Sequence, residues 1–516
     1  MIIVIFIVTL IAYLAIGTIA SKRAAGLDDY FVAGRNAGQL LVLGTFAASW
    51  VSATGIVGYT GASYKNGPGT VIMWGAVPGF MLAVLFIVSK LYRTESWTMF
   101  DYFEKRYCDK RLALIAVFAM FFGMFPYLLS QVMGSANILA GITGIDYKIM
   151  VLVACVVFTI LTLTGGATSV TVTDTTMLII IIFVSIFCFP FAIKGFGGWD
   201  AIMTAQITEA PERFHWTGAA LTPISAISTN LVWMCGMFAG PHQGSRILIA
   251  KDERTAMGGV ILATTFGVII IWSLHNMTAG LWTQVKDLPQ DQATVYLFTH
   301  MKPAVPGAIG ISALFAAALS TATTMLLTLA TGVGKDVYKR LNPDAPNEKM
   351  LKITKVAVVA FAVVTFLFAF FSVSAVSQWG EAGSSMFGCA YFAPLIFGLN
   401  WKKANRQGAY ASMIGGGGLF LILWIGQKFF GMGALPFGLT PVLLGLIVSI
   451  VLMLVVSAAT KSTPEQDAFW ESIQVPKKGA FHESTNMKFK LACCFAVAIG
   501  VIMIICAFTI IPSYPV

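Results

Sequence analysis

The stretch FAASWVSATGIVGYTGASYKNGPG (residues 46–69) is long and apolar enough to cross a membrane, yet glycines and hydroxyl side chains interrupt it. A second stretch, ISTNLVWMCGMFAGPHQGSR (residues 227–246), is interrupted in the same way by Gly236, Gly240 and Pro241. Glycine and proline are common in membrane helices, so one such stretch alone is weak evidence. Carriers built from inverted five-helix repeats, however, place broken helices at matching positions of the two repeats. Five predicted helices separate these two starts, and the pair therefore predicts a carrier with its binding site at mid-membrane.

The composition places most of the chain in lipid. Of its 516 residues, 57% are hydrophobic and only 11% are charged, with a mean hydropathy of +0.82. Soluble domains are nearer 45–50% apolar and about 25% charged. Long apolar runs indicate helices, whereas an outer-membrane barrel would show short alternating strands. We predict an all-α polytopic protein with fourteen spans, beginning near residues 1, 38, 69, 112, 147, 168, 219, 256, 305, 353, 381, 407, 437 and 489.

These spans are predicted to form a single transporter domain over residues 1–516, without a separate soluble domain. The broken helices divide it into parts that we assign as follows: a flanking helix at 1–21, a first repeat at about 38–195, a second at about 219–399, and C-terminal helices at about 407–512.

Basic residues set the predicted orientation. Alternate loops hold 26 of the 33 Lys and Arg residues, which predicts a multi-pass cell-membrane protein with both termini outside the cytoplasm. The net charge of +10 then reflects a cytoplasmic rim facing anionic lipids, and not nucleic acid. Lys22 and Arg23 follow the first apolar run instead of preceding it, so we expect a retained helix and not a signal peptide. Nothing in the sequence implies an obligate protein partner.

Catalytic motifs are missing from the sequence. It contains no GxxxxGK[ST], HExxH or GxSxG pattern, and its five histidines are scattered. We interpret His242 as structural and not as a proton relay. The chain is therefore expected to be a transporter driven by an ion gradient, not an enzyme or an ATP-driven pump.

The stretch AAALSTATTMLLTLA (residues 316–330) places four hydroxyls within five positions of an apolar helix. Polar side chains in a bilayer cost free energy unless a polar group meets them. A dehydrated sodium ion would satisfy several of these oxygens, together with carbonyls of an unwound helix. Hydrogen bonds between neighbouring helices would satisfy them equally well. The residues alone leave both explanations open.

Four segments resemble the sodium/solute symporter family, which includes carriers of sugars, proline, pantothenate, sialic acid and iodide. Its signature "PL…G.FWKRAN..GA" is the most specific match. The similar segments are TLTGGATSVTVTDTTM (162–177), GPHQGSR (240–246), LSTATTMLLTLATGVGKDVYKR (319–340) and FAPLIFGLNWKKANRQGA (392–409). The resemblance implies the LeuT-type fold, a 5+5 inverted repeat, here with one helix before it and three after.

The resemblance also implies a main sodium site, formed by backbone carbonyls of the broken helix and hydroxyls of the later one. It falls on Ala48, Val51, Ala317, Ser320 and Thr321.

Some family members hold a second sodium ion. Its matching positions here all bear side-chain oxygens and are Ser52, Asp174, Thr323 and Thr324. An interfacial charge at a helix start, favoured by the helix dipole, is the alternative explanation for Asp174. One sodium ion is therefore expected as the coupling ion, and a second is an open alternative.

The substrate is less constrained. Trp50 stands where proline carriers have Asp, and Thr54 and Gly55 stand where sugar carriers have a polar pair, which disfavours a sugar. Trp233 matches the aromatic that proline carriers place over their substrate, and Met237 extends an apolar wall beside it, with Met234 and Phe238. Because residues 50–69 most resemble the pantothenate and monocarboxylate branch, we expect a small carboxylate: pantothenate, a short monocarboxylate, or an amino acid such as proline.

Other functions stay open at this point. The fold could serve a membrane sensor, although no kinase follows before Val516. A channel would not need substrate-coupled broken helices. A sugar-specific carrier is disfavoured as above. A proton-coupled carrier usually has a carboxylate in its central site, and we expect the Ser320–Thr321 pair to stand without one, which favours sodium.

Overall fold

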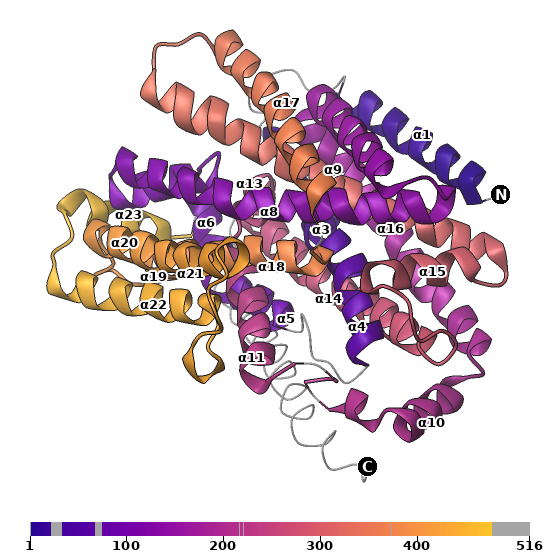
Figure 1. The fold of residues 1–516 in the computed structure, drawn as a ribbon. Helices are drawn as coiled ribbons and strands as arrows, with labels where there is room; N and C mark the ends of the chain where they lie inside the picture. The colour runs from indigo at the N-terminus through magenta and orange to yellow at the C-terminus, as the bar shows by residue number, and fades with distance from the viewer. Residues whose placement is uncertain are drawn as a thin grey trace.

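The computed structural model describes residues 2–21, 33–67, 75–215, 217–219, 221–372 and 374–476. Within these ranges the chain is helical, and the only β-type contact is an isolated bridge between Ala37 and Ala250. Ten described helices are long and apolar enough to span a membrane, or eleven if one bent pair counts as a single span. The prediction of an all-α membrane protein is confirmed (Figure 1).

The main helices follow one another with short connections. In chain order they are α1 (Ile2–Ser21), α3 (Gln39–Trp50), α4 (Thr60–Asn66), α5 (Ala76–Ala83), α6 (Ser89–Arg93), α7 (Met99–Tyr107), α8 (Lys110–Thr143), α9 (Tyr147–Gly195), α10 (Trp199–Glu209), α11 (Pro223–Leu231), α12 (Met237–Ala239), α13 (Pro241–Leu248), α14 (Glu253–Leu281), α15 (Ala293–His300), α16 (Ala304–Thr331), α17 (Asn347–Phe371), α18 (Val376–Phe387), α19 (Ala393–Asn400), α20 (Arg406–Ser412), α21 (Gly418–Phe429), α22 (Pro441–Ala459) and α23 (Pro464–Gln474).

The second predicted span is broken, as the sequence indicates. Helix α3 ends at Trp50, and the chain re-enters a helix at Thr54 with a bend of 52°. Val51 has φ −77° and ψ 75°, which takes it out of the helical conformation. The Ala53 N–H, left without a helical partner, donates to Oε1 of Gln131 on α8 at 2.8 Å. The break is thus held open by a side chain of another helix.

The seventh predicted span is also broken. It runs through α11, a π-helical turn η5 (Val232–Gly236) and α12, and then breaks at Gly240 before α13. Gly240 has extended backbone angles, and Pro241 starts the next helix, where its missing N–H costs nothing. Gly236 passes so close to α18 that a Cβ there would lie 2.1 Å from the Ser384 carbonyl oxygen.

Two long helices, α9 and α16, pack around the broken helix α3. Helices α3, α9 and α16 pack against one another, and α14 packs on α3 and α9. Helix α1 lies against α9 and α16, while α20, α21 and α22 form a separate group at the left of the view in Figure 1. The broken end of α3 therefore faces the middle of α16 inside the bundle.

Several boundaries differ from the prediction. Near residues 147 and 168, where two spans were expected, the structure has one helical stretch, α9, whose 49 residues exceed the length of a single span. The connection after α9 contains α10, the one before α16 contains α15, and the polar segment after α22 contains α23. The span expected near residue 489 lies outside the described residues, as do Lys22, Arg23 and the expected start near residue 69.

Some basic residues counted toward a cytoplasmic rim are instead buried. Arg93 forms a 2.7 Å ion pair with Glu253. Arg106 donates to the carbonyls of Gly398 and Ala404 at 2.6 and 2.8 Å. These guanidinium groups join helices, so the expectation that they face lipid headgroups is wrong: their donors are used inside the protein.

Candidate functional site

The hydroxyl cluster of α16 meets the broken end of α3. The Thr321 hydroxyl lies 3.0 Å from the Ala48 carbonyl oxygen and 3.1 Å from the Ala317 carbonyl oxygen. Ala48 belongs to the last turn of α3, where carbonyls lack helical partners and need another donor or a cation. Val51 is fully buried one step beyond that turn. Three predicted sodium-site residues are thus in direct contact, and Val51 follows Ala48 by three residues, at the end of α3.

Ser320, the fifth predicted residue, points to a carboxylate. Its hydroxyl donates to Oδ1 of Asp174 at 2.5 Å, and Thr45 donates to Oδ2 of the same residue at 2.5 Å. The expectation that the Ser320–Thr321 pair stands without a carboxylate is therefore wrong. Asp174 lies inside α9 and is fully buried, so it is not a charge at a helix start either.

Of the four residues proposed for a second sodium, two meet at a shared partner and two make other hydrogen bonds. The Ser52 hydroxyl lies 3.3 Å from the Tyr127 hydroxyl on α8. Thr323 bonds back to carbonyls of its own helix at 3.0 Å. Asp174 and Thr324 share a partner, because Arg246 contacts both.

Two predicted substrate residues of the broken helices face α8. The Thr54 hydroxyl lies 2.8 Å from the Ser130 hydroxyl and accepts from Nε2 of Gln131 at 3.1 Å. The sulfur of Met237 accepts weak hydrogen bonds of 3.9 Å from Tyr127 and Ser384. Each of the two broken helices thus has polar partners on α8.

Trp233 belongs to a polar chain that the sequence did not reveal. Its indole N–H donates to the Tyr59 hydroxyl at 2.9 Å, and that hydroxyl donates to Glu381 at 3.2 Å. The other oxygen of Glu381 accepts from Thr229 at 2.9 Å. The chain connects α18 with both broken helices, beside the predicted apolar wall. The side chain of Phe238, named for the same wall, lies outside the described part of the structure.

Trp50 has different surroundings from Trp233. Its ring packs edge-on against Phe80 at 5.1 Å between centroids, and Gly267 of α14 leaves room for it. Its indole nitrogen is buried and makes no hydrogen bond. Gly55 lies in the π-helical turn η2 (Thr54–Tyr59), buried with the rest of that turn.

The predicted substrate residues are closed off from solvent in this conformation. Trp50, Thr54, Trp233 and Met237 each have an exposed fraction of 0%. A solute could reach them only after the surrounding helices move.

The sequence pattern of the sodium:solute symporter family matches residues 30–416, about three quarters of the chain. The chain belongs to this family. The sodium/pantothenate symporter of Haemophilus influenzae is 27% identical to it over 82% of this chain and 91% of its own length. The sodium/proline symporter of Escherichia coli is 25% identical over 90% of this chain and 96% of its own.

The fold is shared with a symporter of known structure. A Na+-coupled sialic acid symporter, in its substrate-bound outward-open state, superposes with a TM-score of 0.73, covering 90% of this chain and 99% of its own at 18% identity. This protein is therefore a sodium-coupled solute symporter and not an enzyme.

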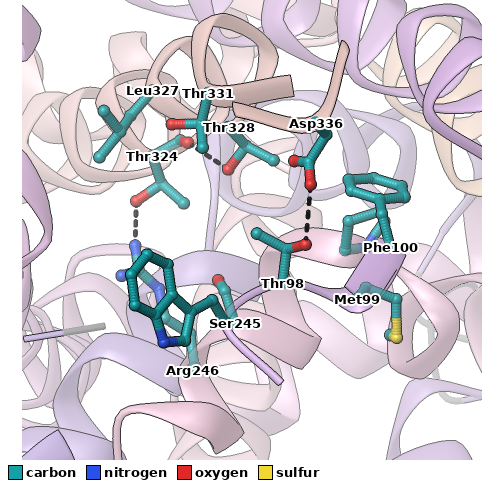
Figure 2. A pocket seen from close by; sticks show the side chains of 12 residues that line it. Thr98, Met99, Phe100, Ser245, Arg246, Thr324, Leu327, Thr328, Thr331 and Asp336 are labelled. Atoms are coloured by element: carbon teal, nitrogen blue, oxygen red, sulfur yellow. Dashed lines mark hydrogen bonds between the residues drawn. The ribbon is translucent and has the colours of Figure 1, made fainter. Parts of the chain in front are cut away.

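A small pocket of this symporter opens beside Arg246, lined by side chains of α7, α13, α16 and η7 (Gly332–Lys339). Figure 2 shows Arg246 pointing at Thr324 from the opposite wall, and Thr98 pointing at Asp336, whose hydrogen bond is 3.1 Å. Asp101, the next residue of α7 after Phe100, forms an ion pair with Lys335 at 2.7 Å. Burial raises the pKa of Asp101, but Lys335 and Arg340 outweigh it and hold this pKa below its usual value.

Sequence reasoning missed two charged groups of this symporter, Glu381 and the inward-facing Arg246. Glu381 is the only acid in the run VSQWGEAGSSMFG (376–388), and an acid within a membrane span is a functional candidate by itself. Arg246 was counted with a loop because it lies near a helix end. The break at Gly240 is the sequence feature from which an inward-facing Arg246 could have been predicted.

Proposed function

We propose that this symporter uses the sodium gradient to import a small organic carboxylate across the cell membrane, by alternating access. The contact between Thr321 and the broken end of α3 carries the proposal. Pantothenate, a short monocarboxylate and an amino acid such as proline are the candidate substrates.

Sodium would bind between α3 and α16, at Ala48, Val51, Ala317, Ser320 and Thr321. The donor set suits the ion, because sodium prefers hard oxygens and these residues offer carbonyls and hydroxyls away from water. The ion supplies a positive charge that both helices can share, and it thereby favours the state in which they are held together. The Ser320 hydroxyl donates its proton to Asp174 at 2.5 Å, which leaves the lone pairs of the hydroxyl oxygen available to the ion.

Substrate would bind beside Trp50, Thr54, Gly55, Trp233 and Met237. Helix ends at the breaks favour an anionic group, and Trp233 and Met237 offer apolar contact. Glu381, connected to Trp233 through Tyr59, supports a solute that also carries hydrogen-bond donors. Among carboxylates, this favours amino acids and pantothenate over simple monocarboxylates.

The architecture we propose has fourteen spans in a 5+5 inverted repeat, with repeats at about 38–195 and 219–399 and flanking helices at 1–21 and 407–512. Both termini would lie outside the cytoplasm, as the Lys and Arg distribution indicates. Sodium binding would shift the population toward the outward-open state, and its loss to the cytoplasm would favour release of the solute.

A thermal-shift screen of the purified protein tests the proposal, in NaCl against matched KCl, with carboxylates, amino acids and sugars. A ligand that binds only the folded protein raises its melting temperature. A sodium-dependent rise that grows with one carboxylate is expected. A rise with a sugar alone, or no sodium effect, would contradict it.

A proton-coupled carrier is the second candidate, favoured by the buried carboxylates Asp174 and Glu381. It predicts a solute-induced shift that depends on pH and is equal in NaCl and KCl. Uptake into proteoliposomes under a pH gradient, without sodium, separates the two functions.

A further inference from the structure

Asp174 already has three polar partners. Its Oδ1 accepts from Ser320, and its Oδ2 accepts from Thr45, each at 2.5 Å. Nη2 of Arg246 lies 3.3 Å from Oδ2, and neither the carboxylate nor the guanidinium is more than 5% exposed. This is a buried ion pair between α9 and α13.

Arg246 makes further contacts that fix it in this place. It donates to the Thr324 hydroxyl on α16, and its Nε lies 3.4 Å from the Ser49 hydroxyl on α3. Figure 2 shows its side chain directed at Thr324 along the edge of the pocket. One guanidinium thus contacts α3, α9 and α16, the helices that surround the proposed sodium site.

The residues proposed for a second sodium therefore do not fit that ion. Arg246 contacts Asp174 and Thr324, Thr323 donates to its own helix, and Ser52 faces Tyr127. A second sodium ion bound directly to the Asp174 carboxylate would place two positive charges against it. Like charges repel strongly where water is excluded, so the guanidinium and the ion would compete for the same oxygens.

We propose that Arg246 is the resident cation of the Asp174 site. The guanidinium takes the place of a second sodium ion, so this symporter couples solute import to one sodium ion per cycle. The count of one rests on the proposed function, since it assumes that sodium binds at Ser320 and Thr321. The assignment of Arg246 itself does not depend on that assumption.

Equilibrium binding of radioactive sodium to the purified full-length protein tests this directly, counted per molecule. The wild type should bind one ion, with a Hill slope of one. Arg246→Met should bind two, because removing the guanidinium frees Asp174 and Thr324. Arg246→Lys keeps the charge and should still bind one. In Arg246→Met combined with Asp174→Asn, the count should return to one.

Asp174→Asn alone gives an answer even if Arg246→Met fails to fold. The proposal expects this variant to bind as many ions as the wild type. Two ions in the wild type, falling to one in Asp174→Asn, would overturn it, as would no gain in a folded Arg246→Met.

A wild type that binds no sodium would refute the proposed sodium coupling and not the assignment of Arg246. In that case, a gain of one ion in Arg246→Met, lost again in the double variant, would support the assignment. No gain would refute it.

Discussion

The Thr321 hydroxyl of α16 donates to the Ala48 carbonyl of α3 across 3.0 Å, although 273 residues separate them in the chain. Ala48 is in the last helical turn before the break, so its carbonyl is available to a partner outside its helix. The same two oxygens would be sodium ligands in the proposed function. Because the hydroxyl can rotate, it can donate to the carbonyl without sodium and turn a lone pair to the ion when sodium binds.

Removing either hydroxyl should weaken sodium binding. Ser320→Ala and Thr321→Ala are each expected to raise the sodium concentration for half-maximal uptake by about tenfold or more, since hydrogen-bond partners of charged groups contribute about 1.5–3 kcal/mol. Sodium-dependent uptake into proteoliposomes measures this.

Two variants control for nonspecific damage. Thr321→Ser keeps the hydroxyl and should stay close to wild type. Ser312→Ala removes another buried hydroxyl of α16, one that only bonds back to Ala308 at 3.0 Å, and should also behave as wild type. Normal uptake at low sodium by both Ser320→Ala and Thr321→Ala would refute the site.

Replacing Glu381 should weaken the affinity for the solute more than the affinity for sodium. Glu381→Gln keeps the shape but removes the charge that Tyr59 and Thr229 hold in place. We expect a rise of about tenfold or more in the half-saturating concentration of an amino acid or hydroxylated carboxylate, with little change for sodium. Glu348→Gln, an exposed acid on α17, is the matched control. An equal loss of affinity for sodium would argue against a role confined to the substrate.

The sequence predicted the breaks in both helices because their cause is local. Glycine and proline act on their own turn of helix, and hydroxyl clusters are visible in an apolar run. The partners of Asp174 could not be predicted in this way. Arg246 reaches it from a helix 72 residues later in the sequence, through an orientation set by the Gly240 break. The Glu381 chain also joins three distant segments, and no periodicity encodes such a convergence.

Gly236 should tolerate no side chain. A Cβ there would lie 2.1 Å from the Ser384 carbonyl oxygen, and backbone cannot yield as a flexible side chain can. Gly236→Ala is expected to destabilise the protein by about 1–3 kcal/mol, the usual cost of overpacking. The thermal midpoint in detergent measures it. Gly418→Ala, where a Cβ meets nothing within 4 Å, should be neutral or slightly stabilising. Equal midpoints for the two variants would contradict the close approach.

Asp291 should make stability depend on pH. It lies in the connection before α15, accepts the Val376 N–H at 2.9 Å, and burial raises its pKa from 3.8 to about 6. The folded protein therefore binds the proton more tightly than the unfolded chain, so this contribution to stability is greatest at low pH and is lost as pH rises from about 4 to about 6.

Asp291→Asn keeps an acceptor for Val376 without titrating. The melting temperature of the wild type, relative to this variant, should fall between pH 4.5 and pH 7. Asp287→Asn, which replaces an exposed acid in the same connection, is the matched control. A constant difference between wild type and Asp291→Asn across this range would show that Asp291 titrates alike in the folded and unfolded states.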